Sequence, residues 1–120
     1  GSFSMTMVEV ITAVQHDLPV KFVILDNDYL GMVRQWQEMF YGGRYSGVRH
    51  PCPQFAKIAE GFGATGMTVS ERSELDDAIA QMLRTDGPVV LHARVEPEEN
   101  VFPMVPAGKS LHDMDLGSLV

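Results

Sequence analysis

Hydrophobic positions along the chain fall into two kinds of run, one typical of helices and one typical of buried strands. Residues 4–15 carry apolar side chains at spacings of three and four, which predicts a helix. Residues 20–25 form a nearly continuous apolar run, which is typical of a strand buried on both faces. The same patterns predict the remaining elements in chain order: helices over 31–40, 54–62 and 74–83, and strands over 66–69 and 89–95.

Polar residues and prolines mark the ends of several of these elements. Thr6 and Glu9 have the spacing of a capping box inside the first helical segment. Pro19 ends that segment, because the residue before a proline is pushed out of the helical region. Ser73, followed by an acidic first turn, is expected to be the N-cap of the helix over 74–83.

Strands that alternate with helices predict an α/β fold, here a three-layer, doubly wound parallel sheet with helices on both faces. Because the chain begins on a helical pattern with no strand before it, we expect this fold to be N-terminally truncated. We expect residues 1–96 to form the domain. Residues 97–120 are rich in proline and glycine and lack periodicity, so we expect a C-terminal tail on the surface.

Composition narrows the class of protein. The 120 residues are 45% hydrophobic, enough for one globular domain. Nine basic residues against 16 acidic ones give a net charge of −7, which argues against nucleic acid as a partner. No apolar run approaches the roughly 18 residues that span a bilayer, so no membrane association is expected. A single cysteine, Cys52, excludes an internal disulfide and favours a reduced, cytosolic-type compartment.

Two loops are the best candidates for a binding site, because ligands of open α/β sheets bind beyond the carboxyl ends of the strands. The free backbone N–H groups of Gly1 and Ser2 suit a phosphate. The loop over 26–31 follows the most apolar strand, and there Asn27 offers an amide oxygen and Tyr29 a carbonyl for Mg²⁺. On spacing alone an alternative stays open, in which this loop only makes a turn and caps the next helix.

Longer strings in the sequence are similar to one enzyme family. Gly1-Ser2-Phe3 with the later Asn27 resembles the thiamine-diphosphate motif, which begins Gly-Asp-Gly and ends near an Asn. Residues 20–46, VKFVILDNDYLGMVRQWQEMFYGGRYS, resemble the catalytic subunits of acetohydroxyacid synthases, also called acetolactate synthases. The strings PQFAKIAE (53–60) and ENVFPMVP (99–106) fit the same family, so the resemblance covers almost the whole chain.

The resemblance implies roles for particular residues. Gly1 and Ser2 would bind the cofactor diphosphate through their main chain. Asn27 would coordinate Mg²⁺ through its side chain, and Tyr29 through its carbonyl. The full set of implied cofactor-binding residues is Gly1, Ser2, Asn27, Tyr29, Leu30, Gly31 and Met32. The set implied to border the substrate channel is Met32, Val33 and Trp36.

Trp36 has a second interpretation. Trp36, Phe40 and Tyr41 stand at helical spacing, which usually indicates core packing. Two departures from the family pattern also stand out. The aspartate that precedes the first motif glycine and binds Mg²⁺ is not in this chain, and Asp26 stands where many members have Asn.

The resemblance implies a parent enzyme that condenses pyruvate with a second 2-ketoacid in branched-chain amino acid biosynthesis, using thiamine diphosphate and Mg²⁺. FAD and the glutamate that activates the cofactor belong to other domains of the family. No catalytic residue is therefore expected within this chain, and the fragment alone is expected to be inactive. The implied partners are those remaining domains, a homodimer or homotetramer, and a possible regulatory small subunit.

The implied location is the cytoplasm of a bacterium, or a plastid or mitochondrion in a eukaryote. Two alternatives to this function remain open. One is another thiamine-diphosphate enzyme, of the pyruvate oxidase or glyoxylate carboligase type. The other is a non-catalytic, anion-binding α/β module. Cys52 lies between two prolines and is not expected to be a catalytic thiol.

Overall fold

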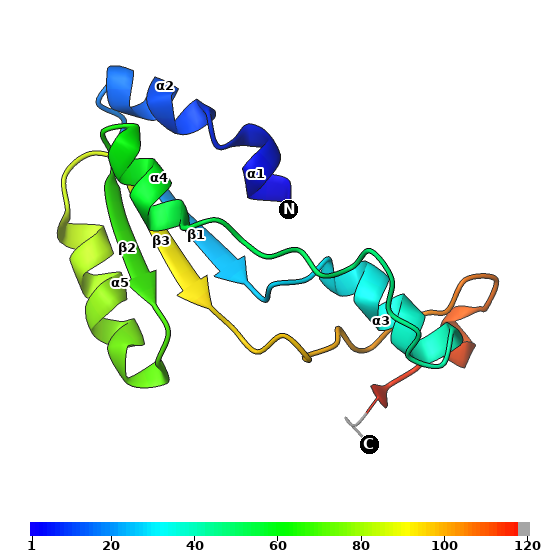
Figure 1. Ribbon diagram of the computed structural model, residues 1–120. Helices are drawn as coiled ribbons and strands as arrows, with labels where there is room; N and C mark the ends of the chain where they lie inside the picture. Colours follow the sequence, from blue (N-terminus) through cyan, green and yellow to red (C-terminus); the bar gives the residue numbers. More distant parts are fainter. Residues whose placement is uncertain (118–120) are drawn as a thin grey trace.

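Three parallel strands form the centre of the molecule (Figure 1). The structure is a computed structural model and describes residues 1–117. The strand order is β1-β3-β2, so the last strand in the sequence lies in the middle. In the register, Leu91 of β3 stands between Val23 of β1 and Met67 of β2. The strand bounds are β1 Lys21–Asp26, β2 Thr65–Val69 and β3 Val89–Arg94.

Helices lie on both faces of this sheet. On one face α4 packs against β2 and β3, with α1 and α2 beside it, and α5 covers the opposite face (Figure 1). The helix α3 lies beyond the carboxyl ends of the strands, away from both layers. The bounds are α1 Ser2–Thr6, α2 Glu9–Gln15, α3 Gly31–Phe40, α4 Phe55–Gly61 and α5 Leu75–Arg84, with 3₁₀ turns at Arg72–Glu74 and Leu111–Asp113.

Alternate residues of β3 supply the two halves of the hydrophobic core. Val90 packs with Val10, Phe55 and Ala59 on the face covered by α2 and α4. Its neighbours Val89 and Leu91 face the other way, and pack against residues of α5 and β2: Val69, Ala78 and Met82. A parallel sheet with helices on both faces is therefore confirmed, in a sheet of three strands.

The first predicted helix is in fact two. The chain turns at Met7 and Val8, between α1 and α2, and the predicted Thr6–Glu9 capping box is absent. The Glu9 carboxylate instead accepts a hydrogen bond from Thr12 Oγ1 at 3.4 Å. The break lets Phe3 of α1 and Val10 of α2 reach the same core cluster, so tertiary packing overrides the helical spacing.

The start of α5 also differs from the prediction. A 3₁₀ turn precedes the helix, so Glu71 is the N-cap of that turn and Glu74 stands at the N-cap position of α5, in place of the predicted Ser73. Glu71 and Glu74 form a reciprocal capping box there, and the Glu71 N–H donates to Glu74 Oε2 at 3.2 Å.

The prediction that the 20–25 strand is buried on both faces is wrong. Val23 and Leu25 of β1 are 53% and 70% exposed. Among the described residues, α5 covers only β2 and β3, so nothing lies over this part of β1. The central strand β3 fits the description instead, since Val89 and Val90 have no exposed surface. No helix within residues 1–117 is long and apolar enough to cross a membrane.

Gly66 lets α4 approach β2 closely. A Cβ atom at this position would lie 2.1 Å from the carbonyl oxygen of Ala56, which is backbone and has no freedom to rotate away. We therefore expect Gly66→Ala to lower the free energy of unfolding by about 2 kcal/mol or more, because α4 must move off the sheet. Urea denaturation followed by circular dichroism measures the change.

Gly61 in α4 provides the matched control, since a Cβ there would meet nothing within 4 Å. Gly61→Ala is expected to leave stability unchanged or to raise it by up to about 1 kcal/mol. Equal stabilities for the two variants would contradict the close helix–strand contact.

Candidate functional site

Two segments that are far apart in the sequence line one cavity at the carboxyl end of β1. Gly1 and Ser2 contribute from the first segment, and Asn27 and Tyr29 from the second. The cavity has a volume of about 250 Å³ and is completed by residues of α1, of β1, of the loop before α4 and of α4: Phe3, Val23, Ile24, Leu25, Asp26, Cys52 and Phe55. The structure thus brings together four of the predicted cofactor-binding residues.

The turn after β1 is built from side-chain hydrogen bonds to its own backbone. Asp26 Oδ1 accepts from the N–H of Asp28 at 3.0 Å, and Asn27 Oδ1 accepts from the N–H of Tyr29 at 3.2 Å. Asp28 has a φ of 57°, in the left-handed region that Asp tolerates better than most residues. These bonds give the turn one defined shape, and Asn27 stands at its centre.

A second segment, residues 48–52, lies beside this turn and is hydrogen-bonded to its backbone. The His50 N–H donates to the Asp28 carbonyl at 2.7 Å, and the Leu30 N–H donates to the Val48 carbonyl at 2.9 Å. Tyr29 and Arg49 form an antiparallel bridge in which the hydrogen bonds come from the residues on either side of Tyr29, so the Tyr29 carbonyl faces away from this segment. Within residues 1–117 it accepts no hydrogen bond, so it is available as an oxygen ligand.

Asp26 links the turn to the central strand. Its Oδ2 lies 2.6 Å from Nε2 of His92 on β3, and both side chains are buried. Burial would raise the pKa of Asp26, but hydrogen bonds from Cys52, from the Asp28 N–H and from His92 outweigh it. The pKa is therefore held below its ordinary value of 3.8. The carboxylate is ionised at neutral pH and accepts on both oxygens.

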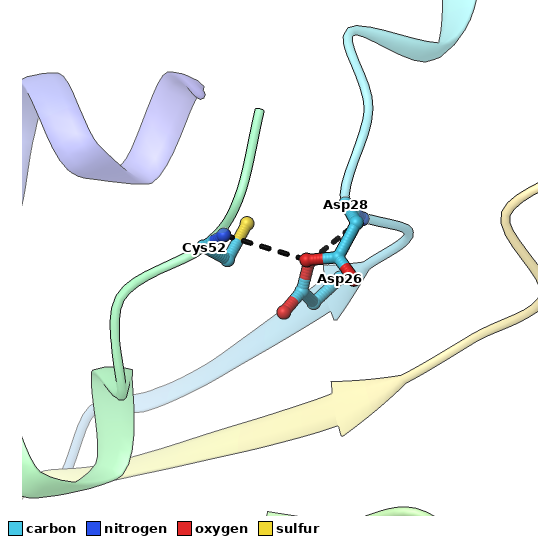
Figure 2. A group of neighbouring side chains, drawn as sticks. All are labelled: Asp26, Asp28 and Cys52. Carbon is cyan, nitrogen blue, oxygen red and sulfur yellow. Dashed lines mark hydrogen bonds between the residues drawn. The ribbon is translucent and has the colours of Figure 1, made fainter. Parts of the chain in front are cut away.

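Asp26, Asp28 and Cys52 converge at one point (Figure 2). Their donor atoms lie within 4.8 Å of one another. Both Asp26 oxygens are already hydrogen-bonded, and Asp28 Oδ1 accepts from the Cys52 N–H at 3.4 Å. Mg²⁺ prefers oxygen to sulfur ligands, so this trio stabilises the turn and does not have the donor set of a magnesium centre.

Cys52 is a poor nucleophile in this environment. Burial and then the neighbouring Asp26 carboxylate raise the pKa of its thiol to about 11. The thiolate is therefore scarce at neutral pH, which agrees with the expectation that Cys52 has no catalytic role.

Leu30 and Gly31 lie close to the cavity without lining it. A Cβ at Gly31 would come within 2.9 Å of Asn27 Nδ2, so glycine lets the Asn27 side chain lie against the start of α3. A Cβ at Gly1 would meet the Leu30 side chain at 3.3 Å. The first helical residues therefore pack directly against both lining segments.

The predicted channel residues are separated from this cavity. Val33 and Trp36 line a second hollow of about 420 Å³, together with Gln37, Tyr41 and Arg44. Met32 is 57% exposed and belongs to neither lining. Trp36 packs edge-on against Phe40, and both side chains are more than one-third exposed, so α3 turns this apolar stripe outward.

The buried residues of α3 are polar, which the hydrophobic pattern did not reveal. Gln35 is 1% exposed and exchanges two hydrogen bonds of 2.9 Å with the backbone of Val101. Arg34 lies between the rings of Tyr29 and Tyr45 and pairs with Glu38 at 3.1 Å. The tail is thus attached to α3, and Arg34 connects α3 to the turn at Tyr29.

Comparison with known proteins places this geometry in a family. The family described as "Thiamine pyrophosphate enzyme, C-terminal TPP binding domain" matches residues 1–93. The chain belongs to this family. The resemblance identified from the sequence motifs is confirmed, and thiamine pyrophosphate is another name for thiamine diphosphate.

Curated relatives of this thiamine pyrophosphate domain are acetolactate synthases. The chain is 44% identical to the mitochondrial acetolactate synthase of Schizosaccharomyces pombe, over 97% of this chain and 17% of that protein. It is 42% identical to the isozyme 2 large subunit of Escherichia coli K12, over 95% of this chain and 21% of that protein. The chain thus spans about a fifth of the length of these relatives.

Solved structures of the same fold include a thiamine diphosphate enzyme of another activity. A 4-hydroxybenzoylformate decarboxylase from Rhodococcus jostii RHA1 superposes with a TM-score of 0.73 at 27% identity, over 80% of this chain and 18% of that one. A benzoylformate decarboxylase from Polynucleobacter necessarius gives 0.74 at 24% identity, over 84% of this chain and 19% of that one, which supports the fold alone.

The raised pKa of Cys52 makes its reactivity a probe of the folded turn. At pH 8 we expect iodoacetamide to modify the folded chain roughly a hundredfold more slowly than the urea-unfolded chain. The pKa of the thiol is about two units higher in the folded chain, so the reactive thiolate is about a hundredfold scarcer. Mass spectrometry over time gives both rates. N-acetylcysteine in each buffer corrects for the denaturant, and equal corrected rates would contradict the buried contact with Asp26.

The attachment of the tail to α3 depends on Gln35. Gln35→Ala leaves the Val101 N–H and C=O without partners, at a cost on the order of 1–3 kcal/mol. We therefore expect faster cleavage by trypsin after Lys109, which lies in the attached segment. Gln37→Ala is the matched control, since Gln37 bonds to Ser46 and not to the tail. Equal cleavage rates in the two variants would contradict this role of Gln35.

Proposed function

We propose that this chain binds the Mg²⁺–diphosphate part of thiamine diphosphate within an acetolactate synthase catalytic subunit. The observation that carries the proposal is the single cavity lined by Gly1, Ser2, Asn27 and Tyr29. Residues from both halves of the sequence motif meet there, at the edge of the sheet where α/β proteins bind ligands.

The donor chemistry at this cavity suits magnesium. Asn27 Oδ1 accepts only one hydrogen bond within the described residues, so it retains a lone pair. The Tyr29 carbonyl faces away from segment 48–52. One or two protein oxygens, with phosphate oxygens and water, complete the octahedron that Mg²⁺ requires. The backbone of Gly1 and Ser2 would hold the diphosphate, and Leu30, Gly31 and Met32 would border the cofactor.

The reaction of the parent enzyme is part of the same proposal. The cofactor supplies the electron sink for decarboxylation and carbon–carbon bond formation. This chain's residues bind and orient it, and Val33 and Trp36 would border the path of the ketoacid substrates. Pyruvate and a second 2-ketoacid are the proposed substrates, on the strength of the acetolactate synthase relatives.

The proposal extends to partners and location, and the same relatives support it. We propose that the chain works with the remaining domains of a catalytic subunit, including one that binds FAD, in a homodimer or homotetramer with a possible regulatory subunit. The relatives include a mitochondrial and a bacterial protein, so the compartment depends on the source. A decarboxylase or oxidase is the alternative reaction, and product analysis of the full enzyme with pyruvate separates the two.

Asn27→Ala tests the metal site. We expect thiamine diphosphate with Mg²⁺ to bind the 120-residue chain in isothermal titration calorimetry, and the variant to bind on the order of tenfold or more weakly, because one metal ligand is lost. With EDTA in place of Mg²⁺ the two proteins should bind equally weakly.

The other asparagine of the chain supplies the control. Asn100 donates to Glu38 and lies outside the cavity lining, so Asn100→Ala is expected to bind the cofactor normally. Undiminished Mg²⁺-dependent binding in Asn27→Ala would refute the proposed metal site.

A further inference from the structure

His92 is a buried polar residue in the most buried strand of the protein. It is 4% exposed, and its ring packs edge-on against Phe55 at 5.4 Å between centroids. No motif in the sequence points to it. Its Nε2 lies 2.6 Å from Asp26 Oδ2, and the side chains of both residues face the α4 side of the sheet.

The Asp26 carboxylate connects two parts of the chain. One oxygen is held by His92 of β3, while the other accepts the Asp28 N–H in the turn. Asn27 lies between these two aspartates. The Asp26 carboxylate is therefore bonded both to the central strand and to the backbone of the turn, and this restrains the position of Asn27, which we propose as the metal ligand.

The turn requires such a restraint, because Asp28 occupies a left-handed conformation with a φ of 57°. Every residue other than glycine adopts it at a cost, which is smaller for aspartate than for most, and surrounding contacts hold the residue there. Segment 48–52, which is itself a loop, holds the turn on one side, and the Val95 N–H after β3 donates to the Asp26 carbonyl at 2.9 Å. The His92–Asp26 bond is the side-chain contact between this turn and the central strand.

We propose that His92 is a positioning residue for the metal site: by holding Asp26, it fixes the turn that directs Asn27 Oδ1 and the Tyr29 carbonyl toward Mg²⁺. This inference rests on the proposed function. Groups that orient metal ligands commonly change metal affinity by tenfold or more when they are removed, and precise sites need such support.

Two amide substitutions separate positioning from packing. His92→Gln retains an N–H donor at about the reach of Nε2, whereas His92→Asn is one methylene shorter and falls short of Asp26. We titrate Mg²⁺ into the 120-residue chain with excess thiamine diphosphate and follow the heat. We expect the Gln variant to bind Mg²⁺ within threefold of the unmodified chain and the Asn variant on the order of tenfold more weakly.

Val90→Ala controls for lost stability. Val90 lies on the same face of β3 as His92 and has no exposed surface, and its apolar side chain makes no hydrogen bond to the turn. The Val90→Ala variant should have a lower melting temperature and an unchanged Mg²⁺ affinity. If Val90→Ala weakens Mg²⁺ binding as much as His92→Asn does at a similar loss of stability, the role of His92 is only structural.

The outcomes also separate this inference from the function beneath it. If Asn27→Ala binds Mg²⁺ as tightly as the unmodified chain, the proposed function fails and this inference fails with it. If Asn27→Ala is weak but both His92 variants bind normally, only the positioning role is refuted. If His92→Asn does not fold, His92→Gln still decides, since a tenfold loss in a folded variant that keeps the donor would overturn the proposal.

Discussion

The central strand β3 is the constraint on which the rest of the structure depends. It is paired along both edges and packed on both faces, and Val89, Val90 and Leu91 are at most 1% exposed. The first five residues of β3, Val89–Ala93, therefore have neighbours on every side, and alternate side chains set which helix packs where. The helices, the strand ends and the loops beyond them are positioned relative to this strand.

The turn after β1 shows how that rigidity reaches the site. Polar groups rather than apolar packing make the connection, through His92 and Asp26. A buried ion pair or hydrogen-bonded pair contributes little net stability against a hydrophobic replacement, because desolvation offsets the attraction. The His92–Asp26 pair instead fixes geometry, because a hydrogen bond sets the orientation of the carboxylate and an apolar contact does not.

The sequence predicted the elements well where local pattern decides them. The helix over 31–40 has the observed bounds, because the polar residues of the loop before it and the glycine-rich loop after it mark both ends. The break at Met7 and the cap at Glu71 were not predictable, because distant packing and a 3₁₀ turn decide them. The predicted burial of the first strand was wrong because hydrophobicity records what a residue can bury, not what covers it.

The site divides in the same way. The residues at positions 1, 2, 27 and 29 were predicted to bind the cofactor from their types and from the family resemblance, and they line one cavity. Gln35, Arg34 and His92 were missed, because their partners are set by the tertiary fold. Gln35 bonds to a residue 66 positions away, and His92 to one equally distant. A single sequence carries no signal for such pairs.

The exposed side of β1 has a consequence for handling the isolated chain. Val23 and Leu25 present apolar surface, and within the described sheet one edge of the strand has unpaired backbone groups. An open edge beside an apolar face is a template for pairing with other strands. We therefore expect β1 to be the segment through which isolated chains associate at high concentration, beside the cavity that Val23 and Leu25 help to line.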